Sequence, residues 1–348
     1  MKARKPPSAP PPTIPGMVYR SRAMQQVAVQ VQRASQSRLP VLITGETGTG
    51  KELIARAIHY LSPRAAHPFS PINSTALQPS LVEASLFGHK QGAFTGAHTN
   101  ALGTLRAANH GTVLLDEIGD LAPELQPKLL RFLQEGEVHV VGETQPRQVD
   151  VRIIAATNKD LQALMAAGQF REDLYYRLLG MTIHLPPLRA HKDDLALLVA
   201  HFLRQACQAE GKGIVTISEA AMETLLRDEW PGNVRQLQTE VQQALLAVGS
   251  GTQLAVEHLS DRLQLRSMDF DETLDRLFRR SRSQPAAKPA LTIEFPRELP
   301  LQETYQQMQR QFLIEALQRH GWNLTHTAKD LGVSLPKLRQ DLKKYGVR

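Results

Sequence analysis

Cysteine is almost absent from this chain of 348 residues, in which Cys207 has no second cysteine to pair with. An intramolecular disulfide is therefore excluded, and we expect a protein of the reducing cytoplasm. Long hydrophobic runs are also missing, since none reaches the ~18 residues that a membrane-spanning helix needs. Residues 1–16 lack the apolar segment of a secretory signal. The sequence therefore predicts neither secretion nor contact with a membrane.

Acidic residues are in the minority: the chain has 34 Asp and Glu and 41 Lys and Arg, which gives a net charge of +7. The excess is uneven, because residues 301–348 carry eight basic and four acidic side chains, an excess of +4, while the other 300 residues contribute +3. A basic excess favours a polyanionic partner, and its position indicates a DNA-binding module at this end of the chain.

Proline content and hydrophobic periodicity divide the chain into five segments. Residues 1–16 hold six prolines and are expected to form a disordered tail. Short apolar runs alternate with helical patterns over residues 17–185, which predicts an α/β domain. Residues 186–265 show helical patterns without clear strands, residues 266–300 indicate a linker, and residues 301–348 are again helical. The expected strands are Leu39–Thr44, Phe69–Asn73, Thr112–Asp116, Val151–Thr157 and Met181–Leu185.

A glycine-rich motif follows the first expected strand and precedes a helical pattern. It reads Gly45-Glu46-Thr47-Gly48-Thr49-Gly50-Lys51 and fits the phosphate-binding pattern G-x-x-x-x-G-K. Glycines allow backbone N–H groups to surround phosphate oxygens, and Lys51 would reach the β- and γ-phosphates of ATP. Glu52 stands where Ser or Thr is usual, so magnesium must be held differently. A glycine-rich turn without a ligand is the alternative, but the strand–loop–helix context favours a nucleotide site over residues 45–52.

Two carboxylates come directly after the buried strand Thr112–Asp116, of which Asp116 is the last residue and Glu117 the next. Ligands bind at the carboxyl ends of strands in parallel α/β sheets. We expect Asp116 to bind Mg²⁺ and Glu117 to polarise the attacking water as a general base. Asn158, after the strand Val151–Thr157, would sense the γ-phosphate; the alternative is a strand-end turn.

Between these motifs lies the hexapeptide Gly92-Ala93-Phe94-Thr95-Gly96-Ala97. It is identical to the signature loop of the bacterial enhancer-binding proteins, the AAA+ activators of sigma-54 RNA polymerase. The resemblance extends from about Val18 to Leu263, and residues 301–348 resemble the Fis-like helix-turn-helix that often follows. Further stretches that resemble this family are Leu86–His89, Leu115–Leu121, Phe170–Leu178, Leu185–Arg189 and Trp230–Arg235.

The resemblance implies both architecture and activity. The fold would be an AAA+ P-loop NTPase core with a helical lid over residues 186–265 and a C-terminal all-α helix-turn-helix over residues 301–348. A homo-oligomeric ring, expected to be a hexamer, would hydrolyse ATP with Mg²⁺ and remodel the closed complex of sigma-54 RNA polymerase into an open complex. Upstream enhancer-type DNA would be the other partner.

The same resemblance assigns roles to single residues. Gly92, Ala93, Phe94, Thr95, Gly96 and Ala97 would contact sigma-54, with Phe94 at the loop tip; a lone Phe is otherwise more often a core residue. Arg171 and Arg177 would be arginine fingers that reach the γ-phosphate of a neighbouring subunit. Their alternative is two surface arginines on a helix.

Arg235 would be a second nucleotide sensor in the lid, and Asn73 would pair with Glu117 and restrain it. Without the resemblance, Asn73 would be interpreted as a turn residue. Two positions depart from the family, which usually has Arg at position 104 and an acidic residue at position 106. Here they are Thr104 and Arg106. In the family these positions would link the nucleotide state to movement of the loop, and the resemblance does not extend to that link.

The C-terminal segment predicts three helices: Tyr305–Arg319, Leu324–Leu331 with Asn323 as its cap, and a third that begins after Ser334. Leu338 and Leu342 should pack inward and leave a polar face for the major groove. A helical oligomerisation hairpin is the alternative. The expected DNA-binding residues are Ser334, Lys337, Arg339, Gln340, Lys343 and Lys344.

Two other functions stay open at this point: an AAA+ machine with another client, and a DNA-binding repressor whose ATPase is inactive. The tail of residues 1–16 is too short for the regulatory domain that most family members carry in front. We therefore expect control by abundance, by a separate inhibitor protein or by assembly on DNA; truncation of a longer chain is the alternative.

Overall fold

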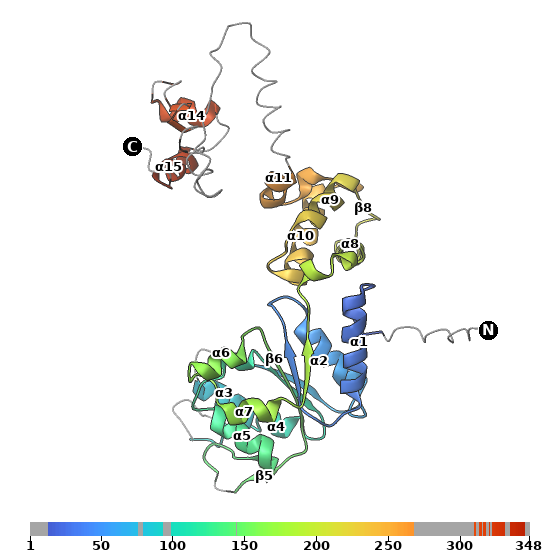
Figure 1. Cartoon of the computed structure of the whole chain (residues 1–348), viewed down its shortest axis with the longest axis vertical. Coiled ribbons are helices and arrows are strands. Elements are labelled where there is room, and N and C mark those ends of the chain that lie inside the picture. Colours follow the sequence, from blue (N-terminus) through green and yellow to red (C-terminus); the bar gives the residue numbers. More distant parts are fainter. Residues whose placement is uncertain are drawn as a thin grey trace, which may run out of the picture. The chain divides into compact units, whose positions relative to one another are not determined.

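The computed structural model divides into two compact units, Met1–Asp275 and Arg276–Arg348, each of which is described by itself (Figure 1). The residues that it describes are 13–75, 79–92, 99–143, 145–267, 310, 313–314, 316–317, 320, 322–330 and 335–344. Within this part of the chain, no helix combines the length and apolarity that crossing a membrane requires.

A five-stranded sheet with the strand order β2-β3-β6-β1-β7 forms the centre of the first unit. Every neighbouring pair is parallel, so all five carboxyl ends lie at one edge. The five expected strands are confirmed to within two residues at each end. Their bounds are β1 Val41–Thr44, β2 Phe69–Asn73, β3 Thr112–Asp116, β6 Arg152–Thr157 and β7 Met181–His184.

Helices cover both faces of this sheet (Figure 1). Side chains alternate along β1: Val41 and Ile43 belong to the apolar core shared with α1 and α2, whereas Leu42 belongs to the core shared with α5 and α7. Both faces are apolar because both are buried, which is why these strands read as continuous apolar runs. The core helices are α1 Arg22–Ser35, α2 Lys51–Tyr60, α3 Pro79–Phe87, α4 Thr104–Ala107, η1 Ile118–Asp120, α5 Gln126–Glu135, α6 Leu161–Ala166 and α7 Glu172–Leu178.

A helical lid follows β7 and has its own apolar core around Trp230, which is fully buried. The indole N–H of Trp230 donates to the carbonyl of Leu225 at 2.9 Å, so its one polar atom is satisfied. The lid elements are η2 Leu188–Ala190, η3 Lys192–Asp194, α8 Leu195–Ala209, β8 Thr216–Ile217, α9 Glu219–Arg227, α10 Asn233–Val248, β9 Gln253–Leu254, η4 Val256–His258 and α11 Asp261–Ser267.

The prediction of a lid without strands was wrong, because β8 and β9 pair in parallel. Each strand has two residues, which is too short for a period-2 pattern. A second short pair, β4 Glu137–Val138 and β5 Arg147–Gln148, is antiparallel and was missed for the same reason. The domain boundaries stay a prediction.

A buried carboxylate ties the segment before α1 to the lid. Asp194 is 1% exposed and accepts hydrogen bonds from the backbone N–H groups of Arg20 at 2.6 Å and Ser21 at 2.7 Å. The Ser21 hydroxyl donates to it at 2.6 Å, and a ring nitrogen of His191 lies 3.0 Å away. Burial by itself would raise the pKa of Asp194, but the hydrogen bonds from Ser21 and Arg20 outweigh it and hold this pKa below its usual value.

Replacing Asp194 with alanine is therefore expected to lower the free energy of unfolding by about 2–4 kcal/mol at pH 7, since two buried donors of Ser21 and the partly buried N–H of Arg20 lose their acceptor. Because the pKa of Asp194 is lower in the folded state, the carboxylate's contribution to stability is present above the unfolded pKa of ~3.9 and is lost as the pH falls through the lower folded pKa. Urea unfolding at pH 7 and in acid measures this loss. Asp193→Ala, which removes the exposed neighbouring carboxylate, is the control; an equal loss in both variants would contradict the prediction.

In the second unit, α14 Leu324–Asp330 and α15 Leu335–Lys344 pack around a small apolar core. Leu338 and Leu342 face this core, as predicted. The side-chain oxygen of Asn323 accepts from the backbone N–H of His326 at 3.2 Å, which confirms the predicted cap. Ser334 and the side chain of Lys337 lie outside the described residues. The other expected DNA-binding side chains are exposed on α15: Arg339, Gln340, Lys343 and Lys344.

Candidate nucleotide-binding site

The phosphate-binding loop runs from the end of β1 to the start of α2, at the edge where the strands end. Gly48 and Gly50 have φ values of 80° and 96°, in the left-handed region that favours glycine. Gly50 is the N-cap of α2 and has no side chain to occupy the N–H groups of the first helical turn. These groups and the helix dipole together form an anion site.

Lys51 is buried at the centre of this loop, with 6% of its surface exposed. Its ammonium donates to the carbonyl of Gly45 at 3.0 Å and lies 3.6 Å from a carboxylate oxygen of Glu117. Buried lysines are found paired, and here the charge is placed between the loop and the strand β3. The two motifs that the sequence predicted to cooperate are therefore brought together.

Asp116 and Glu117 end β3 beside this lysine. Burial raises the pKa of the Asp116 carboxyl, and the negative charge of Glu117 raises it further. Two carboxylates held close together and partly buried favour a cation, and carboxylate oxygens are the protein ligands that Mg²⁺ prefers. The residues present therefore fit a magnesium ion, which Asp116 would hold.

Asn158 connects the end of β6 to both motifs. Its side-chain amide donates to the hydroxyl of Thr47 at 2.8 Å, and its backbone N–H donates to Glu117 at 3.2 Å. The predicted pairing of Asn73 with Glu117 is not formed in this structure. The Asn73 side-chain oxygen instead accepts from the backbone N–H of Thr75 at 2.9 Å, in the turn that the simpler interpretation predicted.

The two predicted arginine fingers lie at the N-cap of α7 and in its last turn, and both are bound by other groups of this chain. Arg171 forms a two-pronged ion pair with Asp173, at 3.0 and 2.7 Å. Arg177 donates to the carbonyl of Leu133 at 3.0 and 2.8 Å. Tyr176, 63% exposed, lies with Arg171 on the same surface hollow. Their action on a neighbouring subunit stays a prediction.

Of the predicted sigma-54 contacts, only Gly92 is described, at a φ of 81°. Ala93, Phe94, Thr95, Gly96 and Ala97 lie outside the described residues. The base of this loop is anchored, because His89 pairs with Ala101 and the backbone N–H of Lys90 donates to Val141 at 2.9 Å.

A small apolar cavity adjoins the phosphate loop at Thr49 and Gly50, and sequence reasoning missed it. Its walls come from the segment before α1, from α8 and from α10, so residues distant in sequence form it. Apolar cavities beside a phosphate site suit the base of a nucleotide. Its lining includes Met17, Val18, Tyr19, Met24, Leu53, Leu198, Phe202 and Val234.

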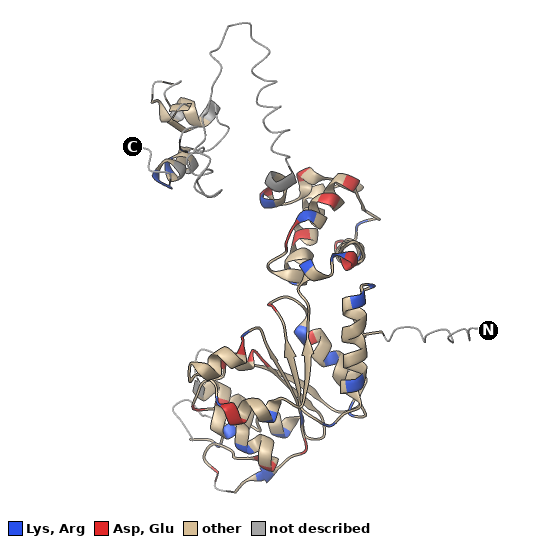
Figure 2. Cartoon of the chain, viewed as in Figure 1, with Lys and Arg blue, Asp and Glu red and all other residues tan. Residues whose placement is uncertain are grey.

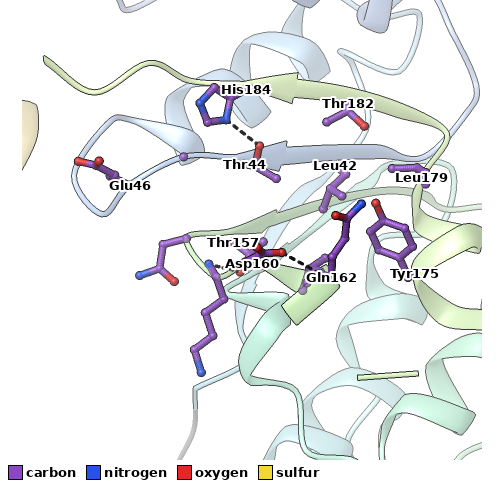
Figure 3. A pocket seen from close by; sticks show the side chains of 14 residues that line it. Leu42, Thr44, Glu46, Thr157, Asp160, Gln162, Tyr175, Leu179, Thr182 and His184 are labelled. Carbon is purple, nitrogen blue, oxygen red and sulfur yellow. Dashed lines mark hydrogen bonds between the residues drawn. The ribbon is translucent and has the colours of Figure 1, made fainter. Parts of the chain in front are cut away.

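A larger cavity of about 410 Å³ lies beside Gly45 and Glu46 (Figure 3). The ends of β1, β6 and β7 contribute polar walls, where the hydroxyl of Thr44 and a ring nitrogen of His184 are 3.1 Å apart. Tyr175 of α7 also lines it, near Leu42 of β1 and Gln162 of α6. The chain therefore leaves open space beside the Asn158 end of the phosphate site.

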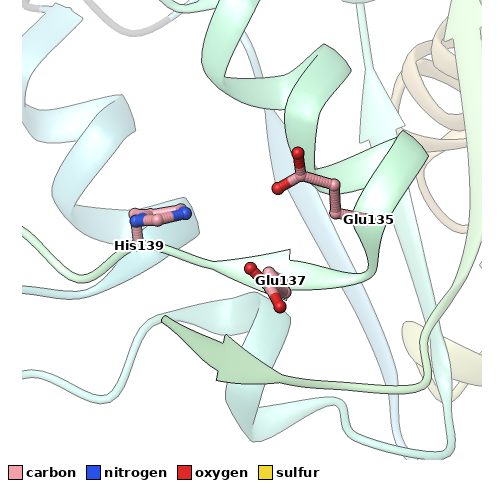
Figure 4. A group of neighbouring side chains, drawn as sticks. All are labelled: Glu135, Glu137 and His139. Carbon is pink, nitrogen blue, oxygen red and sulfur yellow. The ribbon is translucent and has the colours of Figure 1, made fainter. Parts of the chain in front are cut away.

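Among the residues that the structure describes, one cluster of possible metal ligands lies outside the phosphate site, at the junction of α5 and β4. The ligand atoms of Glu135, Glu137 and His139 lie within 4.8 Å of one another (Figure 4). Glu135 accepts from Arg131 at 2.8 Å, and Glu137 accepts from Gln148 at 3.0 Å. Both carboxylates therefore have partners already, and we assign no metal to them.

The parallel sheet, the phosphate loop and the paired carboxylates define a P-loop NTPase of the AAA+ class. Residues 17–184 match the family model of the sigma-54 interaction domain, residues 189–273 that of the AAA+ ATPase lid domain, and residues 305–345 that of the Fis family of bacterial regulatory proteins. The chain belongs to the family of sigma-54-dependent transcriptional regulators.

Several known proteins resemble most of this chain. The hydrogenase transcriptional regulatory protein HoxA of Cupriavidus necator is 44% identical over 93% of this chain and 64% of its own length. The regulatory protein AtoC of Escherichia coli is 41% identical over 94% of this chain and 67% of its own. The crystal structure of NtrX from Brucella abortus in complex with ATP has a TM-score of 0.68 and 31% identity, covering 95% of this chain and 69% of that one. The chain thus spans about two thirds of the length of these relatives.

Proposed function

We propose that this protein hydrolyses ATP in a homo-oligomeric ring, a hexamer, and uses the energy to open the closed complex of sigma-54 RNA polymerase. The observation that carries this is the placement of buried Lys51 between the phosphate loop and Glu117, in a chain that matches the sigma-54 interaction domain over residues 17–184. A relative of similar fold, NtrX, binds ATP.

Each residue of the site has a part in this reaction. Loop N–H groups and Lys51 hold the phosphates and oppose the charge that develops on the transferred group. Glu117 takes a proton from the attacking water. Asn158 donates to Glu117 and to Thr47 and so fixes the position of the base relative to the phosphate loop. Mg²⁺, held by Asp116, would supply further charge neutralisation at the phosphates.

Assembly and DNA binding complete the proposal. Arg171 and Arg177 would complete the active site of a neighbouring subunit, which makes hydrolysis depend on the ring. The exposed basic residues Lys343 and Lys344 in the last turn of α15 (Figure 2), with Arg339 and Gln340, would contact upstream DNA. Control by a separate inhibitor protein stays a prediction.

In vitro transcription from a sigma-54 promoter tests the whole proposal. We expect open complexes only with the protein and hydrolysable ATP. Thr95→Ala should keep ATP turnover within about twofold but lose open complexes at least tenfold (~1.4 kcal/mol), because Thr95 would contact the client rather than the phosphates. Thr99→Ala, at the exposed end of the same segment, is the matched control and should keep both activities.

The outcomes separate the competing functions. ATP turnover without any effect on sigma-54 transcription would indicate an AAA+ machine with another client. DNA binding without ATP turnover would indicate a repressor with an inactive ATPase. Normal open-complex formation by Thr95→Ala would contradict the role assigned to the loop.

A further inference from the structure

Two separate segments of the lid meet the phosphate loop at Asn233. Its side-chain oxygen accepts from the backbone N–H of Leu188 at 2.8 Å. Its amide nitrogen donates to the carboxylate of Glu46 at 3.1 Å and to the carbonyl of Thr47 at 3.0 Å. One buried side chain thus joins η2, the start of α10 and the phosphate loop. Both its amide oxygen and its amide nitrogen take part in these bonds.

The backbones of the lid and the loop also approach closely beside Asn233. A Cβ atom on Gly48 would lie 2.2 Å from the carbonyl oxygen of Gly232, so only glycine fits at position 48. The backbone N–H of Arg235 donates to the carbonyl of Gly48 at 3.2 Å. The predicted sensor arginine therefore begins its side chain directly above the phosphate loop.

The conformation of Asn233 itself is unusual. Its φ is 53°, and its surface is fully buried. Asparagine tolerates the left-handed region better than most residues, but the conformation still persists only where surrounding contacts impose it. The contacts that hold it here are the three side-chain bonds to Leu188, Glu46 and Thr47 and the bond from its own backbone N–H to the carbonyl of Trp230 at 2.8 Å.

Glu46 adds a charged link from the loop to the lid. Both of its carboxylate oxygens accept from the guanidinium of Arg189, and this pair together with the Asn233 bond lowers the pKa of Glu46 to about 2. The side chains of Arg189 and Glu46 are 40% and 41% exposed, so the ion pair alone contributes little. The buried amide of Asn233, which shares the same carboxylate, is the central element.

We propose that Asn233, Glu46 and Arg189 form a clasp that fixes the lid on the phosphate loop and thereby positions Arg235 toward the nucleotide phosphates. None of the three side chains needs to contact the nucleotide for this role. Glu46, which the sequence placed among the phosphate-binding residues, serves there through its backbone, while its carboxylate serves the lid. The inference rests on the proposed ATPase function and deepens it.

The clasp has a sharp test, because Asn233→Asp changes the amide into a carboxylate of the same shape. The new carboxylate would face the Glu46 carboxylate and the Thr47 carbonyl, and both contacts become repulsive. We expect affinity for a fluorescent non-hydrolysable ATP analogue to fall at least tenfold. In the double variant with Glu46→Gln, the amide at position 46 can donate to the carboxylate at position 233, which reverses the wild-type donor and acceptor. The double variant should therefore bind the analogue at least threefold more tightly than Asn233→Asp.

Lid position gives a second readout that does not depend on hydrolysis. With Cys207 replaced by alanine, spin labels at exposed positions Arg33 on α1 and Arg204 on α8 report the distance between core and lid. Asn233→Asp should broaden the distance distribution, and the double variant should narrow it again. Arg189→Gln, an exposed change, should broaden it moderately and weaken binding about threefold even if Asn233→Asp does not fold.

The matched control is Asn109→Asp, in which an exposed asparagine keeps its acceptor oxygen for the backbone N–H of Asp150. It should bind the analogue like the wild type. Wild-type affinity in Asn233→Asp and Arg189→Gln, or a double variant weaker than Asn233→Asp, would overturn the clasp. Analogue binding by a wild type that hydrolyses no ATP would instead count against the proposed function and leave the clasp supported.

Discussion

Replacing Glu117 with alanine should reduce ATP turnover at least a hundredfold and leave ATP binding within about threefold of the wild type. The loss follows from the removal of a general base, which contributes about 10²–10⁴-fold to such reactions. Binding should survive, because the loop N–H groups and Lys51 hold the phosphates without Glu117. Removal of the carboxylate 3.6 Å from Lys51 also frees this ammonium for the nucleotide.

Lys51→Ala should give the opposite pattern and abolish detectable ATP binding, since it removes the buried charge at the centre of the loop. Calorimetric titration with ATP and a phosphate-release assay separate the two effects. Glu124→Ala, an exposed carboxylate on the segment before α5, is the control for Glu117 and should change neither measurement. Near-normal turnover in Glu117→Ala would refute its role as the base.

A mixture of two inactive variants should recover ATPase activity if each active site is completed by a neighbour. Arg177→Ala subunits keep an intact phosphate loop but lack a finger, and Lys51→Ala subunits keep both fingers but lack the loop lysine. In a mixed ring some intact loops face intact fingers. We expect the turnover of each variant alone to fall at least a hundredfold, since an arginine finger contributes ~10³–10⁵-fold to such reactions. In an equal mixture half of the sites have an intact loop, and random pairing gives half of these an intact finger. The mixture should therefore recover about a quarter of wild-type turnover.

The structure makes this experiment informative, because Arg177 is bound to the carbonyl of Leu133 in its own subunit. A merely structural role for Arg177 would weaken every subunit that carries the substitution, and mixing would then bring no recovery. Arg204→Ala, which removes an exposed arginine of the lid, is the matched control. Absence of recovery in mixtures whose ring assembly is verified by light scattering would contradict catalysis between subunits.

Much of the core was predictable from the sequence, because the patterns that indicate it lie within short stretches of consecutive residues. The strand Thr112–Asp116 is buried along nearly its whole length and reads as an apolar run, and Glu117, which follows it, lies 3.6 Å from Lys51 at the edge where the parallel strands end. The glycines of the loop indicate backbone conformations with positive φ, which other residues avoid. Asn158 was found in the same way, as a polar residue directly after a buried strand.

Other residues of the site gave no such signal. Asn73 ends its strand and Asn158 directly follows its own, yet the side-chain oxygen of Asn73 accepts from the backbone N–H of Thr75 two residues on, a local turn that a sequence pattern does not distinguish from a contact with Glu117. The apolar cavity beside Thr49 draws its walls from the segment before α1 and from the lid, and an apolar residue in a helix is by default a core residue.

The order of residues alone therefore specifies the AAA+ core, the phosphate loop, the paired carboxylates after β3 and the helices of the C-terminal segment that the structure describes, since the signal for each lies within a few consecutive positions. The clasp needs the folded chain, because Glu46 is separated from Arg189 by 143 positions and from Asn233 by 187. No spacing rule links residues so far apart; they meet only when β7 brings the lid back over the edge where β1 ends. Local chemistry is encoded in short motifs, whereas the attachment of one domain to another arises from tertiary packing.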